Sequence, residues 1–435
     1  MKKTIICITA AMTMSSSFAQ SLHEEHIDSL ISSTKVIDLD DSPLSLRSQS
    51  DEETRRMIES FYYEQFRHSQ DPDAPYFLFM SKSGQLSMGI GGVVRMRAWF
   101  DWGGAIPVSS FTPYLIPMIP NPTARQQLGT TPAGVCLYFR TLGRSPVIGN
   151  YQLYIEANFN GYQGRDFHLK KAYAVVRDIT VGYTSSTFSD PAALPPMVDA
   201  AGTNDKIDGT TVLLRYMPQI AHNFHAALSI ESPNVQADVD RTTTAKCTSF
   251  IPDIAALIQY EWNKGQHVRL AGIIRSLPYR NLLSERNHTP IGAGISLSSV
   301  ARLLPQFTTY TSVSYGKGIS SLGGDLLVGN YDLLADPTEA GSMYAPRSLG
   351  WHVGVQYNIR PNLYIVLTAS QMRLLPSHSV AADEYKYGLL GVISAFWHPI
   401  PRLQIGTEFD FGKRQNFSGA HRYARRFGAL CQFSF

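Results

Sequence analysis

The chain has 435 residues, a formal net charge of +3 and only 17% charged residues. This near-neutral balance gives no reason to expect a nucleic-acid partner. Beyond the N-terminal twenty residues there is no run of about 18 apolar residues, so a transmembrane helix is excluded.

The first residues predict an export signal. Lys2 and Lys3 precede a short apolar run, and Ser17-Phe18-Ala19 places small residues at both positions that specify a cut. We expect residues 1–19 to be a signal peptide and the mature chain to begin near residue 20. Cys7 lies inside the apolar run, so no lipid anchor is expected.

Residues 20–75 have a different composition and predict a periplasmic extension. Its first part, up to residue 47, is polar and rich in Ser and Asp, and we expect it to be mobile. Ser50-Asp-Glu-Glu53 has the form of a capping box, and apolar residues follow at helical spacing. We therefore expect one amphipathic helix over about 51–68. Two interpretations stay open: a docking or trimeric coiled-coil segment that makes a periplasmic contact, or a helix packed on the rim of a barrel.

No metal or other cofactor is expected. His23-Glu-Glu-His26 offers metal-ligand residue types, but it lies in a mobile acidic segment without further ligands. The three cysteines beyond Cys7 are odd in number and unrelated in spacing, which argues against a disulfide framework.

From residue 76 to 435 the chain alternates with the period of two that marks β-strands. In 85–100 the even positions form an aliphatic face, while Arg95 and Arg97 lie on the other face. A water-filled membrane barrel requires this pattern, whereas in a soluble core the two arginines would need partners. About sixteen such strands are predicted: 85–100, 133–141, 151–160, 167–175, 180–187, 209–217, 223–231, 251–262, 266–276, 291–299, 306–316, 348–359, 362–373, 385–397, 402–413 and 422–435.

The connections between these strands alternate between short and long. Outer-membrane barrels have short periplasmic turns and longer external loops, so this alternation places both termini in the periplasm. A strand at Asp325–Tyr331 would break the alternation, and we assign that segment to a loop. The five tryptophans fall mostly near strand ends and are interpreted as an interface girdle.

The C-terminal strand supports the same fold. Phe427, Phe433 and Phe435 share one face with small residues, and the other face is mostly polar, with Leu430 as the apolar exception. A soluble β-sandwich can show this alternation, but it rarely ends on an exposed aromatic residue. We predict an all-β protein: a transmembrane antiparallel β-barrel in a Gram-negative outer membrane, with a short N-terminal periplasmic helix.

Residues 165–216 resemble the DcaP-like family of trimeric outer-membrane porins. The similarity rests on Lys170-Lys-Ala-Tyr173, on Gly182-x-x-x-Ser-Thr-Phe-x-Asp190 with the Pro/Asp/Gly-rich segment after it, and on Leu214-Arg-Tyr216. This resemblance implies a homotrimer whose third external loop, here about 188–208, folds into each pore. It also implies passive uptake of small, often negatively charged solutes. The chain departs from the family in having two lysines where an arginine usually precedes Ala-Tyr.

Alternation also predicts the residues that line the pore. Arg95 and Arg97 on the first strand and Arg422 and Arg426 on the last point inward, and these strands become neighbours when the barrel closes. Four arginines could thus form one basic wall. Further inward candidates are Arg215, Arg269 and Arg275.

The inserted loop would place acidic side chains opposite this basic wall. Its predicted constriction residues are Phe188, Asp190, Asp199 and Asp205. Such a transverse field orients dipolar solutes and favours small anions where arginine dominates. For each arginine a structural salt bridge is the alternative, and for each aspartate ordinary turn chemistry.

The resulting hypothesis is a diffusion porin for small hydrophilic, carboxylate-type solutes, with membrane lipid and other copies of the chain as partners. Enzyme motifs such as Gly-x-Ser-x-Gly and His-Glu-x-x-His are absent, so no catalytic residue is expected. The alternative is a non-conducting barrel that serves as an adhesin or assembly anchor. Only about 55 residues precede the first strand, too few for the globular plug of a 22-stranded transporter.

Overall fold

The computed structural model describes residues 33–40, 45–46, 77–81, 85–119, 121–160, 164–263 and 265–435. The predicted signal peptide 1–19 and the predicted helix 51–68 lie outside these residues.

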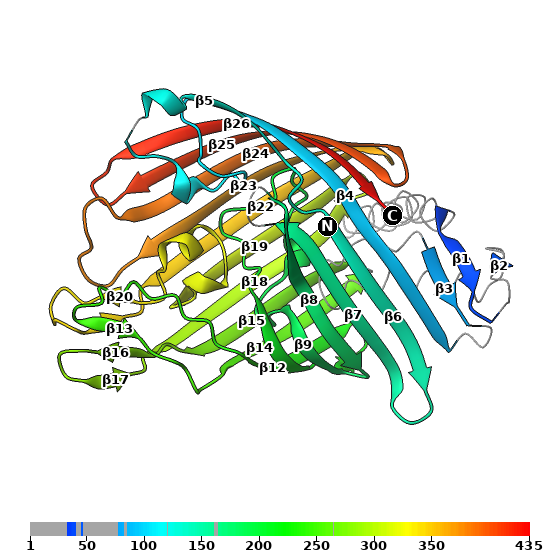
Figure 1. The fold of residues 1–435 in the computed structure, drawn as a ribbon, viewed down its shortest axis with the longest axis horizontal. Coiled ribbons are helices and arrows are strands. Elements are labelled where there is room, and N and C mark those ends of the chain that lie inside the picture. Colours follow the sequence, from blue (N-terminus) through cyan, green and yellow to red (C-terminus); the bar gives the residue numbers. More distant parts are fainter. Residues whose placement is uncertain are drawn as a thin grey trace, which may run out of the picture.

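Sixteen long strands form a closed antiparallel barrel (Figure 1). They are β4 (Leu86–Trp102), β6 (Cys136–Ser145), β7 (Gly149–Asn160), β8 (Asp166–Val176), β9 (Ile179–Ser185), β10 (Thr210–Tyr216), β12 (Phe224–Glu231), β14 (Asp253–Asn263), β15 (Gln266–Ser276), β18 (Ile291–Leu304), β19 (Phe307–Lys317), β22 (Arg347–Arg360), β23 (Leu363–Leu375), β24 (Tyr385–Ile400), β25 (Leu403–Asn416) and β26 (His421–Ser434). The predicted fold class is confirmed, and Asp325–Gly329 forms a short 3-10 helix, η6, within a loop as expected.

The last strand closes the barrel against the first. In the β26–β4 pair Arg426 lies opposite Asp101 and Ser434 opposite Val93. The backbone N–H groups of Phe435 and Gly92 each donate to the carbonyl of the other residue at 2.9 Å. The C-terminal residue is therefore part of the closure, which leaves few unpaired strand edges.

Burial follows the predicted alternation along the strands. On β4 Val94, Met96 and Phe100 are exposed on the outside, whereas Arg97 and Asp101 are buried inside. Leu430 also faces inward and is buried, because Val198 of a loop packs against it. A water-filled lumen needs polar walls, so an inward apolar residue marks a place where another segment covers the wall.

Trp99 corrects one sequence-based interpretation. It shares the inward face of β4 and is only 9% exposed, with the Arg426 guanidinium 5.1 Å from its ring centroid. Trp99 therefore contributes a cation–π contact inside the barrel and is not part of an interface girdle.

Short strands extend the sheet at the end where β4 begins. β3 (Phe77–Met80) pairs with β4, and β1 (Lys35–Asp38) runs parallel to β3 and pairs with β2 (Ser45–Leu46). Arg402, beside the turn between β24 and β25, donates to Ser33 Oγ at 2.8 Å. Part of the segment expected to be mobile is thus ordered as strand against the barrel.

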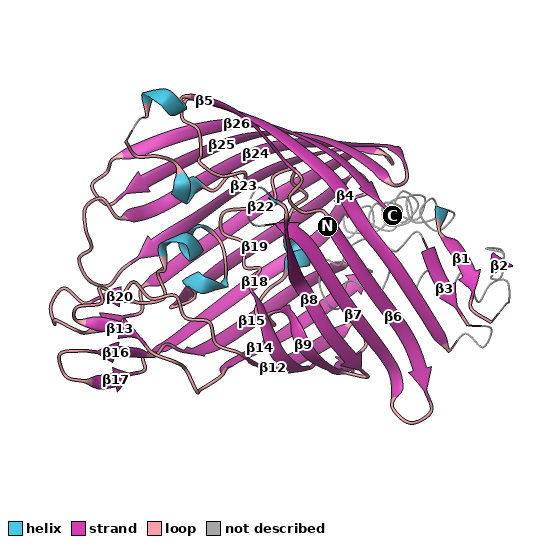
Figure 2. Ribbon diagram, viewed as in Figure 1, coloured by secondary structure: helices cyan, strands magenta, loops and turns pink. Residues whose placement is uncertain are grey.

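At the opposite end the long loops carry further small elements. β5 (Gln126–Thr131) pairs with β4, and β13 (Thr244–Lys246), β16 (Tyr279–Asn281) and β17 (Arg286–His288) form a separate sheet. In Figure 2 the described helical segments, shown in cyan, are short turns in or beside loops. Among the residues described, no helix is long and apolar enough to cross a membrane.

Candidate functional site

The segment 186–209, between β9 and β10, lies inside the barrel. At its start Glu231 of β12 accepts hydrogen bonds from Ser186 Oγ at 2.6 Å and from the backbone N–H of Thr187 at 2.8 Å. Arg215 of β10 donates from Nε to Thr187 Oγ1 at 2.7 Å. The predicted inward residue Arg215 is therefore buried and holds the first turn of this segment.

Phe188 is buried against the inner wall and not exposed to an open lumen. It packs with a cluster of inward-facing apolar residues that includes Leu257 of β14 and Ile273 of β15. A Cβ on Gly294 of β18 would lie 3.1 Å from the Phe188 ring, so this glycine leaves room for it. Phe188 is an apolar anchor of the segment.

Asp190 forms the first charged anchor. Its carboxylate lies 2.8 Å from His267 Nε2 and 3.4 Å from Arg269 Nη1, and it accepts from Ser298 Oγ at 2.5 Å. Arg269 also donates to the carbonyl of Ser189 at 2.7 Å. Burial opposes ionisation, but the Arg269 charge and the His267 hydrogen bond outweigh it and hold the pKa of Asp190 well below its ordinary value. Asp190 and Arg269, both predicted as site residues, are brought together.

Asp199 forms the second charged anchor, on the wall where the barrel closes. Arg426 Nη1 lies 3.2 Å and Arg97 Nη1 3.8 Å from its carboxylate. Glu408 of β25 accepts from the backbone N–H groups of Val198 at 2.6 Å and Asp199 at 2.7 Å. The tip of the segment is thus fixed to β4, β25 and β26.

Asp205 forms the third anchor. His352 of β22 places Nδ1 at 2.9 Å from the Asp205 carboxylate and Nε2 at 3.0 Å from the carbonyl of Ala193. The imidazole therefore bridges two parts of the same segment. His267 and His352 were not singled out from the sequence, where no spacing relates them to their aspartates.

The four predicted wall arginines do not form one group. Arg426 makes two hydrogen bonds to Asp101, at 2.7 and 3.0 Å, and both it and Arg97 reach Asp199. Arg95 faces the same side but packs beside Gly134. Arg422 is exposed and donates to the carbonyl of Met118 at 3.2 Å, because its position on β26 lies beyond the top of β4. The stagger between the two strands separates Arg422 from the others.

Part of the segment 103–125, residues 105–116, also enters the barrel, which was not predicted from the sequence. Ile106, Phe111 and Ile116 are fully buried in a cluster with Leu390 and Val392 of β24. The signal was present in the sequence, since inward-facing leucine and valine on β24 need cover from another segment.

The segment 318–346 is held inside by Arg275 of β15, another predicted inward residue. Arg275 lies between Asp253 at 3.0 Å and Asp332 at 3.1 Å, and donates to the carbonyl of Gly318 at 2.7 Å. Its side chain is completely buried. Arg275 therefore forms buried ion pairs that hold the loop in place, and it does not line the pore.

Asp325 joins this segment to the first one. Its carboxylate accepts from Tyr385 Oη at 2.7 Å and from Asn204 Nδ2 at 3.0 Å. Burial raises the pKa of Asp325 to about 7, against the lowering effect of these hydrogen bonds.

This shift predicts a pH-dependent stability. Between pH 3.8 and about 7 the folded chain keeps Asp325 protonated while the unfolded chain ionises it, so stability falls as pH rises. The free energy of unfolding of the wild type minus that of Asp325→Asn should decrease by about 1.4 kcal/mol per pH unit in this window. Urea titrations of both proteins at several pH values measure this difference. A difference that is constant with pH would contradict the assignment.

The sector formed by β6, β7 and β8 differs from the rest of the wall. A β-bulge opposite Glu156 lets Lys170 reach its carboxylate at 2.7 Å while Lys171 is buried on the inward face. Because of this bulge, simple alternation along β8 does not decide which of the two lysines faces inward. The hydrogen bonds and ion pairs that the structure gives for segment 186–209 join it to strands on the arc of the barrel from β10 round to β26 and β4. The inward side chains of the β6–β8 sector include Cys136, Tyr138, Arg140, Gln152, Tyr154, Glu156, Lys171, Tyr173 and Val175.

The described part of the chain offers no group of three metal-ligating side chains. Cys136, Cys247 and Cys431 are free thiols, with Cys136 buried and Cys431 exposed. The loop anchors described above hold the segment 186–209 in place inside the barrel.

Comparison with solved structures identifies the fold. The outer membrane channel DcaP of Acinetobacter baumannii superimposes with a TM-score of 0.70 at 19% identity, over 82% of this chain and 99% of that one. An anion-selective porin from Comamonas acidovorans gives 0.53 at 10% identity, over 80% and 100% of the two chains. OmpTdeltaL8, a loop L8 deletion mutant of OmpT, an outer membrane protein of Vibrio cholerae, gives 0.51 at 8% identity, over 81% and 100%.

No family model and no curated protein matches the sequence. At these identities the likeness to solved structures is one of fold. The resemblance noted in residues 165–216 therefore extends to the architecture of the whole barrel.

Proposed function

We propose that this chain is a diffusion porin of the Gram-negative outer membrane, with both termini in the periplasm. The observation that carries the proposal is the segment 186–209, which anchors on β12, β15, β22 and β25 and so spans the interior of the barrel. A barrel narrowed from within by a fixed segment passes solutes below a size limit without binding them tightly. Like the porins of similar fold, it would assemble as a homotrimer embedded in outer-membrane lipid, and residues 51–68 would make a periplasmic contact.

The β6–β8 sector is the proposed route. Elsewhere the inward wall carries apolar residues covered by 103–125, 186–209 and 318–346, as in the Phe111 and Phe188 clusters. The β6–β8 sector instead carries tyrosine, amide and charged side chains on its inner face, among them Arg140 and Lys171, and each of these is itself no more than 5% exposed. A hydrophilic solute would pass between this sector and the inserted segment, with 186–209 as the constriction.

A preference for anions follows from the pairing of charges. Asp190, Asp199 and Asp205 of the inserted segment are each occupied by cationic or imidazole groups of the wall. These three carboxylates therefore hold the segment in place, while Arg95, Arg140 and Lys171 add positive charge to the inner wall, where Glu156 is paired with Lys170. Small carboxylates suit such a route, since guanidinium groups match their geometry.

Single-channel recording of signal-cleaved protein in a planar bilayer with a salt gradient tests the proposal. Openings in groups of three with a reversal potential that favours chloride are expected. Replacing Arg140 and Lys171 by glutamine should move the reversal potential toward cation preference, because two positive charges leave the route. The matched control replaces Lys246 and Arg286, which lie on the small external sheet, and should not change the reversal potential.

Equal shifts of the reversal potential in both variants would contradict the proposed route but not the proposal that the chain is a porin. Absence of conductance in a folded barrel would favour the non-conducting adhesin or anchor. That alternative has one observation in its favour, namely that three loops fill much of the interior.

A further inference from the structure

A belt of cations lies on the outer surface of the barrel, at the end opposite the short turns. We name it the basic belt; it consists of Lys317, Arg347, Arg373, Lys386, Lys413 and Arg425. Arg425 has the same parity on β26 as the exposed Phe427, and Lys413 the same parity on β25 as the exposed Phe411. Most of these cations therefore point away from the lumen.

Three members of the basic belt lie equally far along their strands. Counted from the first residue of each strand, Lys317 of β19, Arg373 of β23 and Lys413 of β25 each stand ten residues further on. Ten residues at about 3.3 Å per residue, tilted by about 45°, climb about 23 Å, close to the roughly 25 Å apolar band of such barrels. The cations thus stand at the outer edge of the band, where lipid headgroups begin.

Aromatic side chains hold these cations without neutralising them. Arg373 lies 5.1 Å from the ring centroid of Tyr387, and Lys413 donates to Tyr387 Oη at 2.9 Å. Lys386 lies 5.8 Å from the centroid of Phe417. Among the described residues, no salt bridge includes a member of the basic belt, and Arg373 Nε is buried without a hydrogen-bond partner.

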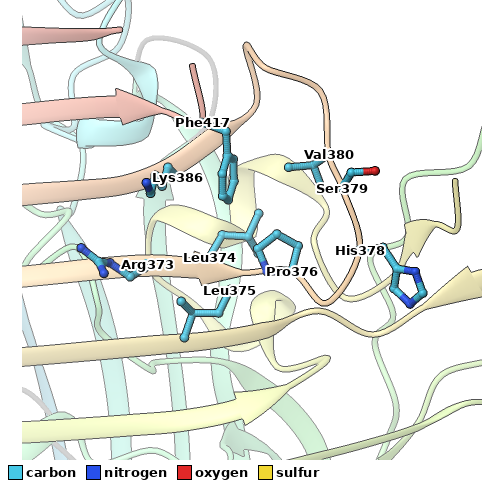
Figure 3. Close-up of a pocket in the computed structure, with 9 residues that line it drawn as sticks. All are labelled: Arg373, Leu374, Leu375, Pro376, His378, Ser379, Val380, Lys386 and Phe417. Carbon is cyan, nitrogen blue, oxygen red and sulfur yellow. The ribbon is translucent and has the colours of Figure 1, made fainter. Parts of the chain in front are cut away.

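Two hollows open within the belt. One of about 430 Å³ is lined by Arg373, Lys386 and an apolar group that includes Leu375, Val380 and Phe417. Figure 3 shows Lys386 and Phe417 on one side of it and the loop carrying His378 on the other. His378 Nδ1 lies 3.4 Å from the carboxylate of Asp336, so this carboxylate near the hollow already has a partner.

The second hollow, of about 460 Å³, also combines two cationic side chains with apolar ones. Lys317 and Arg347 line it together with Tyr315 and Ile295, which lie on the outward faces of β19 and β18. Cations beside exposed apolar surface suit a ligand that has both anionic groups and hydrocarbon.

We propose that the basic belt binds a phosphate-bearing glycolipid of the outer leaflet, with its phosphates on the cations and its acyl chains along the exposed apolar strands below. Charge complementarity selects this occupant, since unpaired guanidinium and ammonium groups at headgroup height attract phosphate. The proposal rests on the placement in the outer membrane proposed above. It is independent of conduction, because the belt does not line the lumen.

Native mass spectrometry of the full chain, titrated with diphosphorylated lipid A or with the same lipid after phosphate removal, tests this site. The phosphorylated lipid is expected to bind, and the dephosphorylated lipid to bind far more weakly. Replacing Arg373, Lys386 and Lys413 together by glutamine should weaken binding of the phosphorylated lipid on the order of a hundredfold, as three cations near a lipid surface each contribute severalfold.

Two further variants test whether a loss of lipid binding is caused by misfolding. The charge-retaining pair Arg373→Lys and Lys413→Arg should keep the affinity of the wild type. The matched control replaces Lys246, Arg280 and Arg286, three cations of the small external sheet, and should also keep it. Conductance of all variants should equal that of the wild type, so failure of this site is distinguishable from failure of the porin.

Equal affinity for the two lipids would overturn the proposal. So would equal affinity of the wild type and the triple belt variant, or an equal loss in the control on the external sheet.

Discussion

Replacing Arg275 by methionine is expected to lower the free energy of unfolding by about 3–5 kcal/mol, because two buried carboxylates lose their common partner. Asp253 and Asp332 lie 3.0 and 3.1 Å from its guanidinium, and all three side chains are almost completely buried. Arg275 also donates to the carbonyls of Gly318 and Asn234, so two long loops lose a fixed point as well. Urea unfolding in liposomes, followed by tryptophan fluorescence, measures the change.

A rescue variant separates charge from packing. Adding Asp253→Asn and Asp332→Asn to Arg275→Met removes the uncompensated charges and should restore much of the lost stability. The exposed Arg286 replaced by methionine is the control and should change stability by no more than about 0.5 kcal/mol. An Arg275→Met protein as stable as the wild type would show that the ion pairs do not hold these loops.

Asp199→Ala is expected to have the largest effect on conduction. It leaves Arg97 and Arg426 without their shared partner on the inserted segment, so the segment is less firmly fixed and the lumen gains positive charge. We expect a higher conductance, a reversal potential further toward chloride, and a loss of about 3 kcal/mol in unfolding free energy. Planar-bilayer recording and urea unfolding of the same preparation provide both readouts.

Asp208→Ala is the matched control. Asp208 lies on the same segment, but its side chain is 40% exposed and pairs only with Lys206 at 2.7 Å. An exposed pair of this kind contributes about 0–1 kcal/mol, so stability and selectivity should barely change. If the two variants behaved alike, Asp199 would be an ordinary loop aspartate and not an anchor of the constriction.

The arginines illustrate how far alternation predicts a lumen. Arg97, Arg215, Arg269 and Arg426 all face inward, as their positions on the strands indicate. Alternation does not say which charge each one meets. Arg269 meets Asp190 because a turn of the inserted segment places that carboxylate beside β15, a contact across 79 residues of sequence. A salt bridge depends on a few ångströms in three dimensions, which no local pattern encodes.

The loops illustrate a second limit of prediction from the sequence. The length of a loop predicts on which side of the membrane it lies, but not whether it turns into the barrel. Segments 103–125 and 318–346 turn inward because Phe111 and Leu326 find apolar partners on the inner wall, among them Leu390 and Leu374. Inward apolar positions on β23 and β24 were visible in the sequence as exceptions to the alternation, and they signalled this packing.

The sequence by itself determined the strand number, the alternation of lipid-facing and inward faces, and the closure of the last strand on the first. These properties follow from side-chain period and connection length, which are local. Only the tertiary structure decided which charges are paired and which loops fill the interior. Those contacts depend on strand tilt and stagger, which arise only when all sixteen strands close into one barrel.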